Sequence, residues 1–252
     1  MKHLVTKLAL PTIVAAAATF SNTAMAVPYL QLDIAGGSYD TGTQTVVTTA
    51  DQFTVYAHAD GLYGGAGNSL STLNDTFYLA IALIPQTAAV NPSPDLGTIT
   101  VNGTTINVTS DMVYGNPPLE SNLAHDGGDL SSHGIYDTYY KEIAFNFVAA
   151  KQGAQYNTEL SGAGTGVLAG TGMYYQDFVI DISGLDDGYG LHFDLYHAYA
   201  KSATDIDVNA FAPFSHDAQT SLTRVPVPEP SSLALLALGL AGVGFSRRMA
   251  RK

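Results

Sequence analysis

Nine residues of the sequence hold two imidazoles and two carboxylates, side chains that bind divalent metal ions. These four residues, the candidate ligand loop, are His125, Asp126, Asp129 and His133. Their spacing matches no metal-binding motif of known mechanism. A polar surface loop is therefore the alternative interpretation.

A second candidate metal site lies further along the chain. Asp205 and Asp207 have the spacing of the first two ligands of a calcium-binding EF-hand loop. That loop needs glycine at its sixth position and glutamate at its twelfth, where this sequence has Ala210 and His216. An EF-hand is excluded, and the acidic residues predict instead another kind of calcium site, made of Asp205, Asp207 and Asp217. No other cofactor is expected.

A third group depends on how two predicted strands pair. If segments 177–182 and 191–199 form a hairpin, their outward faces meet, because residues i and i+2 of a strand point to the same side. Solvation of an exposed face explains the same pattern. The residues brought together would be Asp177, Asp181, His192, Asp194 and Tyr196.

Hydrolase chemistry has little support in the sequence. Ser215, His216 and Asp217 are a nucleophile, a base and an acid in a row. Neighbouring residues of one extended strand cannot point at each other as a catalytic relay requires. The chain has no G-x-S-x-G and no H-E-x-x-H pattern. We therefore expect a protein that is not an enzyme, with a secreted hydrolase as the least favoured alternative.

The charges and the absence of cysteine limit the function classes. The chain has 22 acidic and 10 basic residues, a formal net charge of −12, and no cysteine. Most of the basic residues lie near the two ends, so the region between them is strongly acidic and would repel nucleic acid. Without cysteine the chain forms neither disulfides nor thiolate metal sites.

The N-terminus has the organisation of a secretory signal peptide over residues 1–26. Lys2 and Lys7 precede an apolar run, and Ala24 and Ala26 form the small-residue pattern A-x-A before Val27. An uncleaved membrane anchor is the alternative. Cleavage by signal peptidase would leave an exported domain over residues 27–222, which is long enough for a core of its own.

The C-terminal region reads as a stalk, a membrane helix and a basic tail. Prolines in residues 223–230 favour an extended, exposed stalk. Residues 231–246 carry no charge and are somewhat fewer than the roughly 20 that a bilayer core needs. The basic residues 247–252 should stay in the cytoplasm by the positive-inside rule, which places the domain outside the inner membrane.

The order of these three parts resembles the PEP-CTERM sorting signal. The matching residues are Val227, Pro228, Glu229 and Pro230, with Arg247 and Arg248 after the apolar helix. The resemblance implies that an exosortase, a transpeptidase-like membrane enzyme, recognises and removes the tail. It also implies a Gram-negative bacterium that makes exopolysaccharide and passes the domain, after transient anchoring in the inner membrane, to the cell surface or extracellular matrix.

Between the two ends, alternation with a period of two residues indicates an all-β domain. Segment 76–84 is apolar on both faces, as in a central strand. We predict an antiparallel β-sandwich with jelly-roll-like connections. The other predicted strands are 29–34, 53–58, 141–148, 177–182 and 191–199.

The clearest local signal is a hairpin over residues 98–108. Asn102-Gly103 suits a two-residue type I′ turn. That turn sets a register that pairs Val101 with Thr104 and Ile99 with Ile106. Residues 162–170, which superficially match a dinucleotide-binding fingerprint, are predicted to be a loop because no helix follows them.

The body of the chain also resembles the choice-of-anchor N family. The resemblance lies in LQLDIAGGSYD from residue 30, GLHFDLY from residue 190 and FAPFSHDA from residue 211. Members share a body and differ in their C-terminal sorting signal. The family has no established activity, so it implies no catalytic residues.

These observations predict an exported, exosortase-processed surface or matrix protein with a structural or adhesive β domain. The alternative is a calcium- or polysaccharide-binding module, in which Tyr136, Tyr139 and Tyr140 would stack on sugar rings. Signal peptidase and exosortase are the expected protein partners, and exopolysaccharide is the ligand of the alternative. Nucleic acid is not an expected partner.

Overall fold

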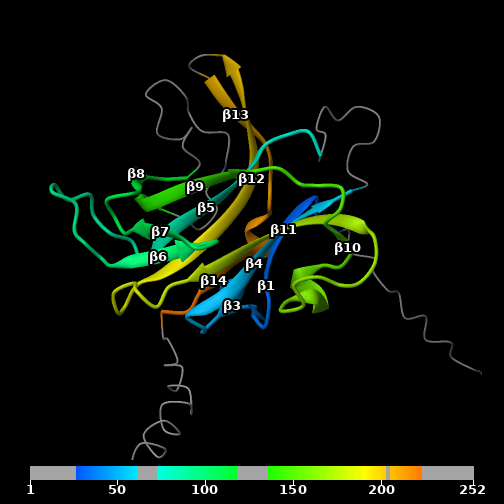
Figure 1. Cartoon of the computed structure of the whole chain (residues 1–252), viewed down its shortest axis with the longest axis horizontal. Coiled ribbons are helices and arrows are strands. Elements are labelled where there is room, and N and C mark those ends of the chain that lie inside the picture. The colour runs from blue at the N-terminus through cyan, green and yellow to red at the C-terminus, as the bar shows by residue number, and fades with distance from the viewer. Residues whose placement is uncertain (1–26, 62–72, 118–135, 203–204, 223–252) are drawn as a thin grey trace, which may run out of the picture.

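The computed structural model describes residues 27–61, 73–117, 136–202 and 205–222. These residues form two β-sheets, which we call sheet A and sheet B (Figure 1). The predicted signal peptide, the candidate ligand loop and the predicted C-terminal stalk, helix and basic tail lie outside the described residues. Within the described ranges, no helix has the length and apolar character that crossing a bilayer requires.

Sheet A has six strands. Their spatial order is β1 (Leu30–Ile34), β4 (Gln52–Asp60), β11 (Gly172–Asp181), β6 (Thr98–Val101) and β7 (Thr104–Asn107), and β10 (Gln152–Ala154) also pairs with β11. All the pairs in this sheet are antiparallel.

Sheet B has eight strands. Their order is β2 (Ser38–Asp40), β3 (Thr45–Thr48), β14 (Asp217–Thr220), β12 (Gly190–Ser202), β5 (Phe77–Ile84), β9 (Thr138–Phe145) and β8 (Val113–Gly115), and β13 (Asp205–Phe211) also pairs with β12. β14 and β3 are parallel, so the sheet is mixed and the predicted all-antiparallel pairing is wrong at this one ladder. The described residues also include two short helical turns, η2 (Thr158–Gly162) and η3 (Phe214–His216).

The inner faces of the two sheets share one hydrophobic core. Phe53 of β4 packs edge-to-face against Phe193 of β12, with ring centroids 6.0 Å apart. Phe145 of β9 meets Phe178 of β11 in the same way at 5.2 Å. These contacts join sheet A to sheet B, an arrangement consistent with the predicted sandwich. The jelly-roll-like connectivity stays a prediction.

Several predicted elements are confirmed. β5 lies between β12 and β9, and nearly all of its side chains are buried, as its apolar character on both faces indicated. β6 and β7 form the predicted hairpin with the predicted register. Asn102 and Gly103 have φ values of 50° and 78°, as a type I′ turn requires. Strand β9 begins and ends three residues earlier than predicted.

Segments 177–182 and 191–199 do not form the hairpin on which the third candidate group depended. The two strands belong to different sheets, because the connection between β11 and β12 crosses from one layer to the other. Backbone hydrogen bonds hold this connection beside the start of β6. The Thr98 N–H donates to the Gly184 carbonyl at 2.8 Å, and the Asp186 N–H donates to the Leu96 carbonyl at 3.0 Å. β12 then continues in sheet B between β14 and β5.

Candidate functional site

Three ionisable side chains meet on the outer face of sheet B, where β12 lies beside β14. Alternation along β12 turns Leu191 and Phe193 into the core and so directs His192 and Asp194 outward. β14 pairs Ala218 with Phe193, which sets Asp217 beside Asp194. We call His192, Asp194 and Asp217 the β12–β14 cluster.

The cluster is compact and almost fully buried. His192 Nε2 lies 3.2 Å from Asp194 Oδ1 and 3.8 Å from Asp217 Oδ2. The three residues are 7%, 5% and 2% exposed, respectively. This burial distinguishes the cluster from the acidic groups that are commonly found solvated on protein surfaces.

The buried charges of the cluster influence each other strongly. Burial alone would lower the pKa of His192, but the Asp194 and Asp217 carboxylates raise it to about 9. Burial raises the pKa of Asp217 well above its usual range, and the nearby Asp194 carboxylate adds to this effect. At neutral pH the imidazole is therefore protonated, and Asp217 retains its proton more readily than an ordinary carboxyl group does.

A cavity of about 680 Å³ opens onto this cluster. His192 and Asp217 both contribute to its wall, and Asp194 does not. Gln219, two residues after Asp217 on β14, lines the same cavity and hydrogen-bonds the His192 side chain. The other lining residues are Asp40, Thr43, Thr45, Val47, Ile84, Pro85, Tyr136, Phe214, Thr220, Ser221 and Leu222.

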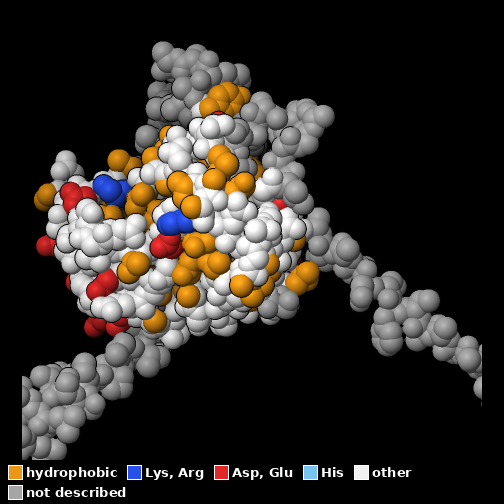
Figure 2. Space-filling view, turned by 45° about the vertical axis from the view of Figure 1, so that its right-hand side comes forward, with side chains coloured by type: hydrophobic (Ala, Val, Ile, Leu, Met, Phe, Trp, Pro, Cys, Tyr) orange, Lys and Arg blue, Asp and Glu red, His pale blue; other side chains and the backbone are white. Residues whose placement is uncertain are grey.

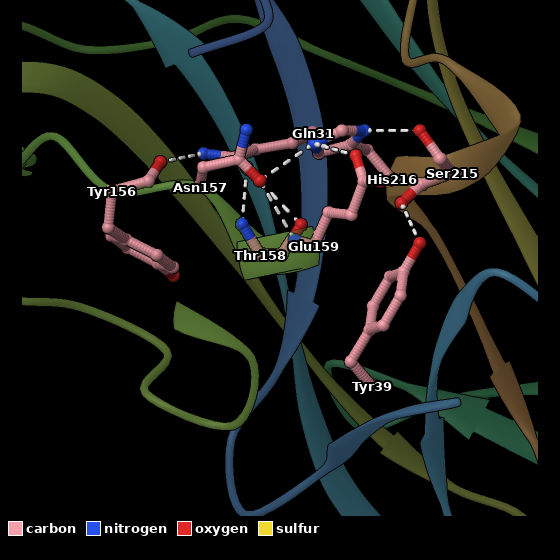
Figure 3. Close-up of polar contacts among 8 residues, drawn as sticks. All are labelled: Gln31, Tyr39, Tyr156, Asn157, Thr158, Glu159, Ser215 and His216. Carbon is pink, nitrogen blue, oxygen red and sulfur yellow. Dashed lines mark hydrogen bonds and ion pairs between the residues drawn. The ribbon is translucent and has the colours of Figure 1, made fainter. Parts of the chain in front are cut away.

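A second polar group contains the Ser-His pair and is shown in Figure 3. The Ser215 hydroxyl lies 2.8 Å from His216 Nδ1, and His216 Nε2 lies 3.0 Å from Asn157 Oδ1. The same Asn157 atom accepts a hydrogen bond from the backbone N–H of Glu159 at 2.9 Å, as an amide oxygen does. Because an amide oxygen cannot donate, His216 must donate to it from Nε2. Nδ1 is then free of a proton and accepts the hydrogen bond from Ser215.

This geometry corrects one sequence-based expectation. Residues 214–216 form the 3₁₀ turn η3 instead of an extended strand, so the neighbouring Ser215 and His216 do contact each other. Asp217 takes no part, because its side chain faces His192 on the other side. Burial lowers the pKa of His216 and keeps the ring neutral. Ser215 is not among the residues that line the cavity.

The Ser215–His216–Asn157 chain therefore joins two segments of the fold. It ties η3 to the start of η2, and the Tyr39 hydroxyl adds β2 by donating to the Ser215 carbonyl at 3.1 Å (Figure 3). Gln31 of β1 binds the same region through its side-chain amide, which donates to the Tyr156 carbonyl at 2.7 Å. These contacts give the pair a structural role.

Another buried network lies on the outer face of sheet A. The Asp33 carboxylate accepts hydrogen bonds from the backbone N–H groups of Gly164 and Gly166 at 2.7 and 2.8 Å. The Tyr156 hydroxyl lies 2.9 Å from both Asp33 Oδ2 and His58 Nε2. The network fixes residues 162–170 against β1 and β4, and it confirms that this glycine-rich segment is a loop.

The predicted calcium ligands do not form one group along the backbone. Asp217 precedes Ala218, which pairs with Phe193 of β12, whereas Asp207 pairs with Tyr199 of the same strand. Six residues of a strand span about 20 Å. Asp205 lies still further along, opposite Ser202. The structure therefore places Asp217 with His192 and Asp194, and Asp205 and Asp207 toward the other end of β12.

The structure places the other predicted site residues outside the β12–β14 cluster or does not describe them, although Tyr136 lines the same cavity. Asp181, at the end of β11 in sheet A, accepts hydrogen bonds from the Gln52 side chain and the Ser183 N–H, and it lies in a different sheet from His192. Tyr139 and Tyr140 are 3% and 0% exposed, so their rings cannot stack on a sugar, whereas Tyr136 lines the cavity. His125, Asp126, Asp129 and His133 lie outside the described part, as do the signal-cleavage residues Ala24 and Ala26.

Comparison with known proteins identifies the C-terminal region. Residues 226–248 match the model of the PEP-CTERM protein-sorting motif, which covers Val227–Pro230, Arg247 and Arg248. No curated protein and no solved structure matches the chain. The comparisons give no support to the resemblance of the body to the choice-of-anchor N family. The motif is the sorting signal that exosortase recognises, and it marks this chain as an exported protein of the cell envelope or surface.

Proposed function

We propose that the exported domain is a structural or adhesive component of the cell surface or extracellular matrix, and that it is not an enzyme. The observation that carries the proposal is the PEP-CTERM motif at residues 226–248, because it directs the attached β domain to exosortase. The use of Ser215 and His216 to hold η2, η3 and β2 together supports a structural role for the residues closest to hydrolase chemistry.

The surface of the β domain supports an adhesive role. On the face shown in Figure 2, hydrophobic side chains are exposed in several places and charged side chains are few. Large apolar side chains with about half of their surface exposed include Leu160, Val179 and Phe214. Exposed apolar groups of this kind contribute binding area when two surfaces meet.

The experiment compares adhesion and sorting in the source bacterium. A strain that lacks the protein should adhere less well or lose matrix integrity, and the wild-type chain should restore both. Glu229→Ala, which alters the Pro-Glu-Pro sequence, should leave the protein in the membrane fraction with its tail attached and should not restore adhesion. Asp187→Ala, a matched loss of one exposed carboxylate within the β domain, should behave as wild type.

Three outcomes would contradict the proposal in different ways. Normal adhesion and matrix integrity in the deletion strain would remove the structural or adhesive role. Normal processing of Glu229→Ala would instead show that the Pro-Glu-Pro sequence is dispensable for sorting. A substrate turned over by the purified chain would refute the non-enzymatic assignment.

Polysaccharide binding is a second candidate function, favoured by an aromatic surface on the outer face of sheet A. Tyr56 and Tyr175 have ring centroids 6.0 Å apart. Lys151 lies over the Tyr175 ring, with Nζ 5.9 Å from its centroid, and pairs with Asp177. Half-buried aromatic rings beside hydrogen-bonding groups are suited to stacking on sugars.

Affinity retention on polysaccharide from the source bacterium tests this second function. We expect Tyr175→Ala to reduce retention severalfold, because it removes a stacking surface without disturbing the core. Tyr199→Ala, on β12 of sheet B, removes an exposed tyrosine elsewhere and should leave retention unchanged. Equal retention of all three proteins, or no retention of the wild type, would exclude binding at this surface.

A further inference from the structure

The Asp217 carboxyl group is buried without a hydrogen-bond donor. Among the described residues, no N–H or O–H group donates to this side chain within hydrogen-bond distance, and its ion-pair partner His192 Nε2 is 3.8 Å away. Buried polar groups nearly always have partners, and a buried carboxyl group that lacks one takes up a proton or a cation. Asp217 also lines the cavity, so a cation can reach it from that side.

The neighbouring atoms lie at the separations that a metal ion requires. Each of His192, Asp194 and Asp217 offers one nitrogen or oxygen atom as a ligand, and these three atoms lie within 4.8 Å of one another. Tetrahedral zinc, with bonds of about 2.0–2.2 Å, separates its ligand atoms by about 3.4 Å. The distances of 3.2 and 3.8 Å from His192 Nε2 to the two carboxylates lie on either side of that value.

The backbone holds these ligands in place before a metal arrives. His192 and Asp194 share one face of β12, and the β14 ladder fixes Asp217 beside them. Gln219 hydrogen-bonds the His192 side chain, which is the kind of contact that orients imidazole ligands in metal sites. Binding would therefore need only small side-chain movements.

The donor set selects the class of metal. Calcium takes about six to eight oxygen ligands, and an imidazole nitrogen is a poor substitute for one of them. One imidazole nitrogen with two carboxylate oxygens suits zinc and similar first-row divalent ions. We propose that His192, Asp194 and Asp217 bind one such ion, with zinc as the representative metal.

The cavity gives the proposed site an open side. Among the described residues, three ligands converge on the metal position, and two of them belong to the cavity wall. A fourth position would be filled by water or by a small anionic group that enters the cavity. The proposal is independent of the adhesive role, because it concerns the interior of the β domain and not its surface or its sorting.

Metal titration of the full chain tests the proposal. The chain, purified in detergent without a histidine tag and stripped with a chelator, should bind one equivalent of Zn²⁺ by calorimetry. Asp217→Asn and His192→Gln should each weaken binding by more than about 100-fold, because each removes a direct ligand, and loss of a group that only hydrogen-bonds a ligand already costs about 10–100-fold. Cobalt substitution should give the visible absorption of a low-coordinate N/O site in the wild type alone.

Controls separate this site from other metal ligands and from misfolding. Asp181→Asn removes a carboxylate outside the cluster, and the double variant His125→Ala, His133→Ala removes the imidazoles of the candidate ligand loop. Both should bind as wild type does. Circular dichroism should show that Asp217→Asn, which replaces a buried acid by a neutral isostere, is folded.

Three results would overturn the proposal. The first is the absence of zinc binding by the folded wild-type chain. The second is binding that is lost with His125 and His133 but kept without His192 and Asp217. The third is one equivalent of calcium, bound in preference to zinc and unaffected by His192→Gln.

Discussion

Buried polar side chains hold the segment around Tyr156 and Gly166 against sheet A. Asp33, Tyr156 and His58 form one connected network between β1, β4 and the loop that begins after η2. Burial lowers the pKa of His58 from 6.5 to about 3, so the ring is neutral in the folded protein at every pH at which cells live. In the unfolded chain the same ring takes up a proton near its ordinary pKa.

This difference predicts that stability falls in acid. Between pH 6.5 and about 3, the unfolded state binds a proton at His58 that the folded state does not, so stability is lost as the pH decreases. The contribution approaches about 1.4 kcal/mol per pH unit. Urea unfolding near neutral pH and in mild acid should therefore show a smaller loss of stability for His58→Gln than for wild type. An equal loss in the two proteins would contradict the assignment of a neutral His58.

At the scale of elements, the connection between β11 and β12 takes the chain from sheet A to sheet B, to which β12, β13 and β14 belong. Gly97 and Leu185 form an isolated β-bridge at this connection. Gly97 has a φ of +90°, and a Cβ atom there would lie 2.1 Å from the Gly184 carbonyl oxygen. Glycine is therefore required both by the backbone conformation and by the close approach of the two segments.

Gly97→Ala and Gly103→Ala form a matched pair that tests this crossing. Gly103 also has a positive φ, but a Cβ there would contact nothing, so alanine should cost only about 1 kcal/mol of conformational strain. Gly97→Ala adds a steric clash and should be about 1–3 kcal/mol more destabilising. Urea denaturation midpoints of the two variants measure the difference. Equal midpoints would show that the backbone of the connection shifts at little cost to accommodate the added methyl group.

For the whole molecule, the sequence predicted where the strands lie better than it predicted which strands pair. A period of two located β1, β4, β11 and β12, and apolar character on both faces located β5. The hairpin β6–β7 was predicted with its register because its turn is local. Periodicity does not say which sheet a strand joins, so it could not show that β11 and β12 lie in different sheets.

The same limit applies to the candidate site. Outward-facing His192 and Asp194 were recognised as a group, because they lie two residues apart on one strand. Asp217 was assigned to a different site, since only the pairing of β14 with β12 brings it to them. The contact of Ser215 with His216 was missed because the 3₁₀ turn after Pro213 was taken for an extended strand.

The position of β14 has a mechanical consequence for a domain that is handled by its tail. β14 is the final strand before the tail, and it has hydrogen-bonded neighbours on both sides, parallel β3 and antiparallel β12. A pull along this strand loads both ladders in shear, so more hydrogen bonds resist it together than at an edge strand, which has one ladder. A force applied through the tail would thus reach the interior of sheet B first, next to the wall of the cavity.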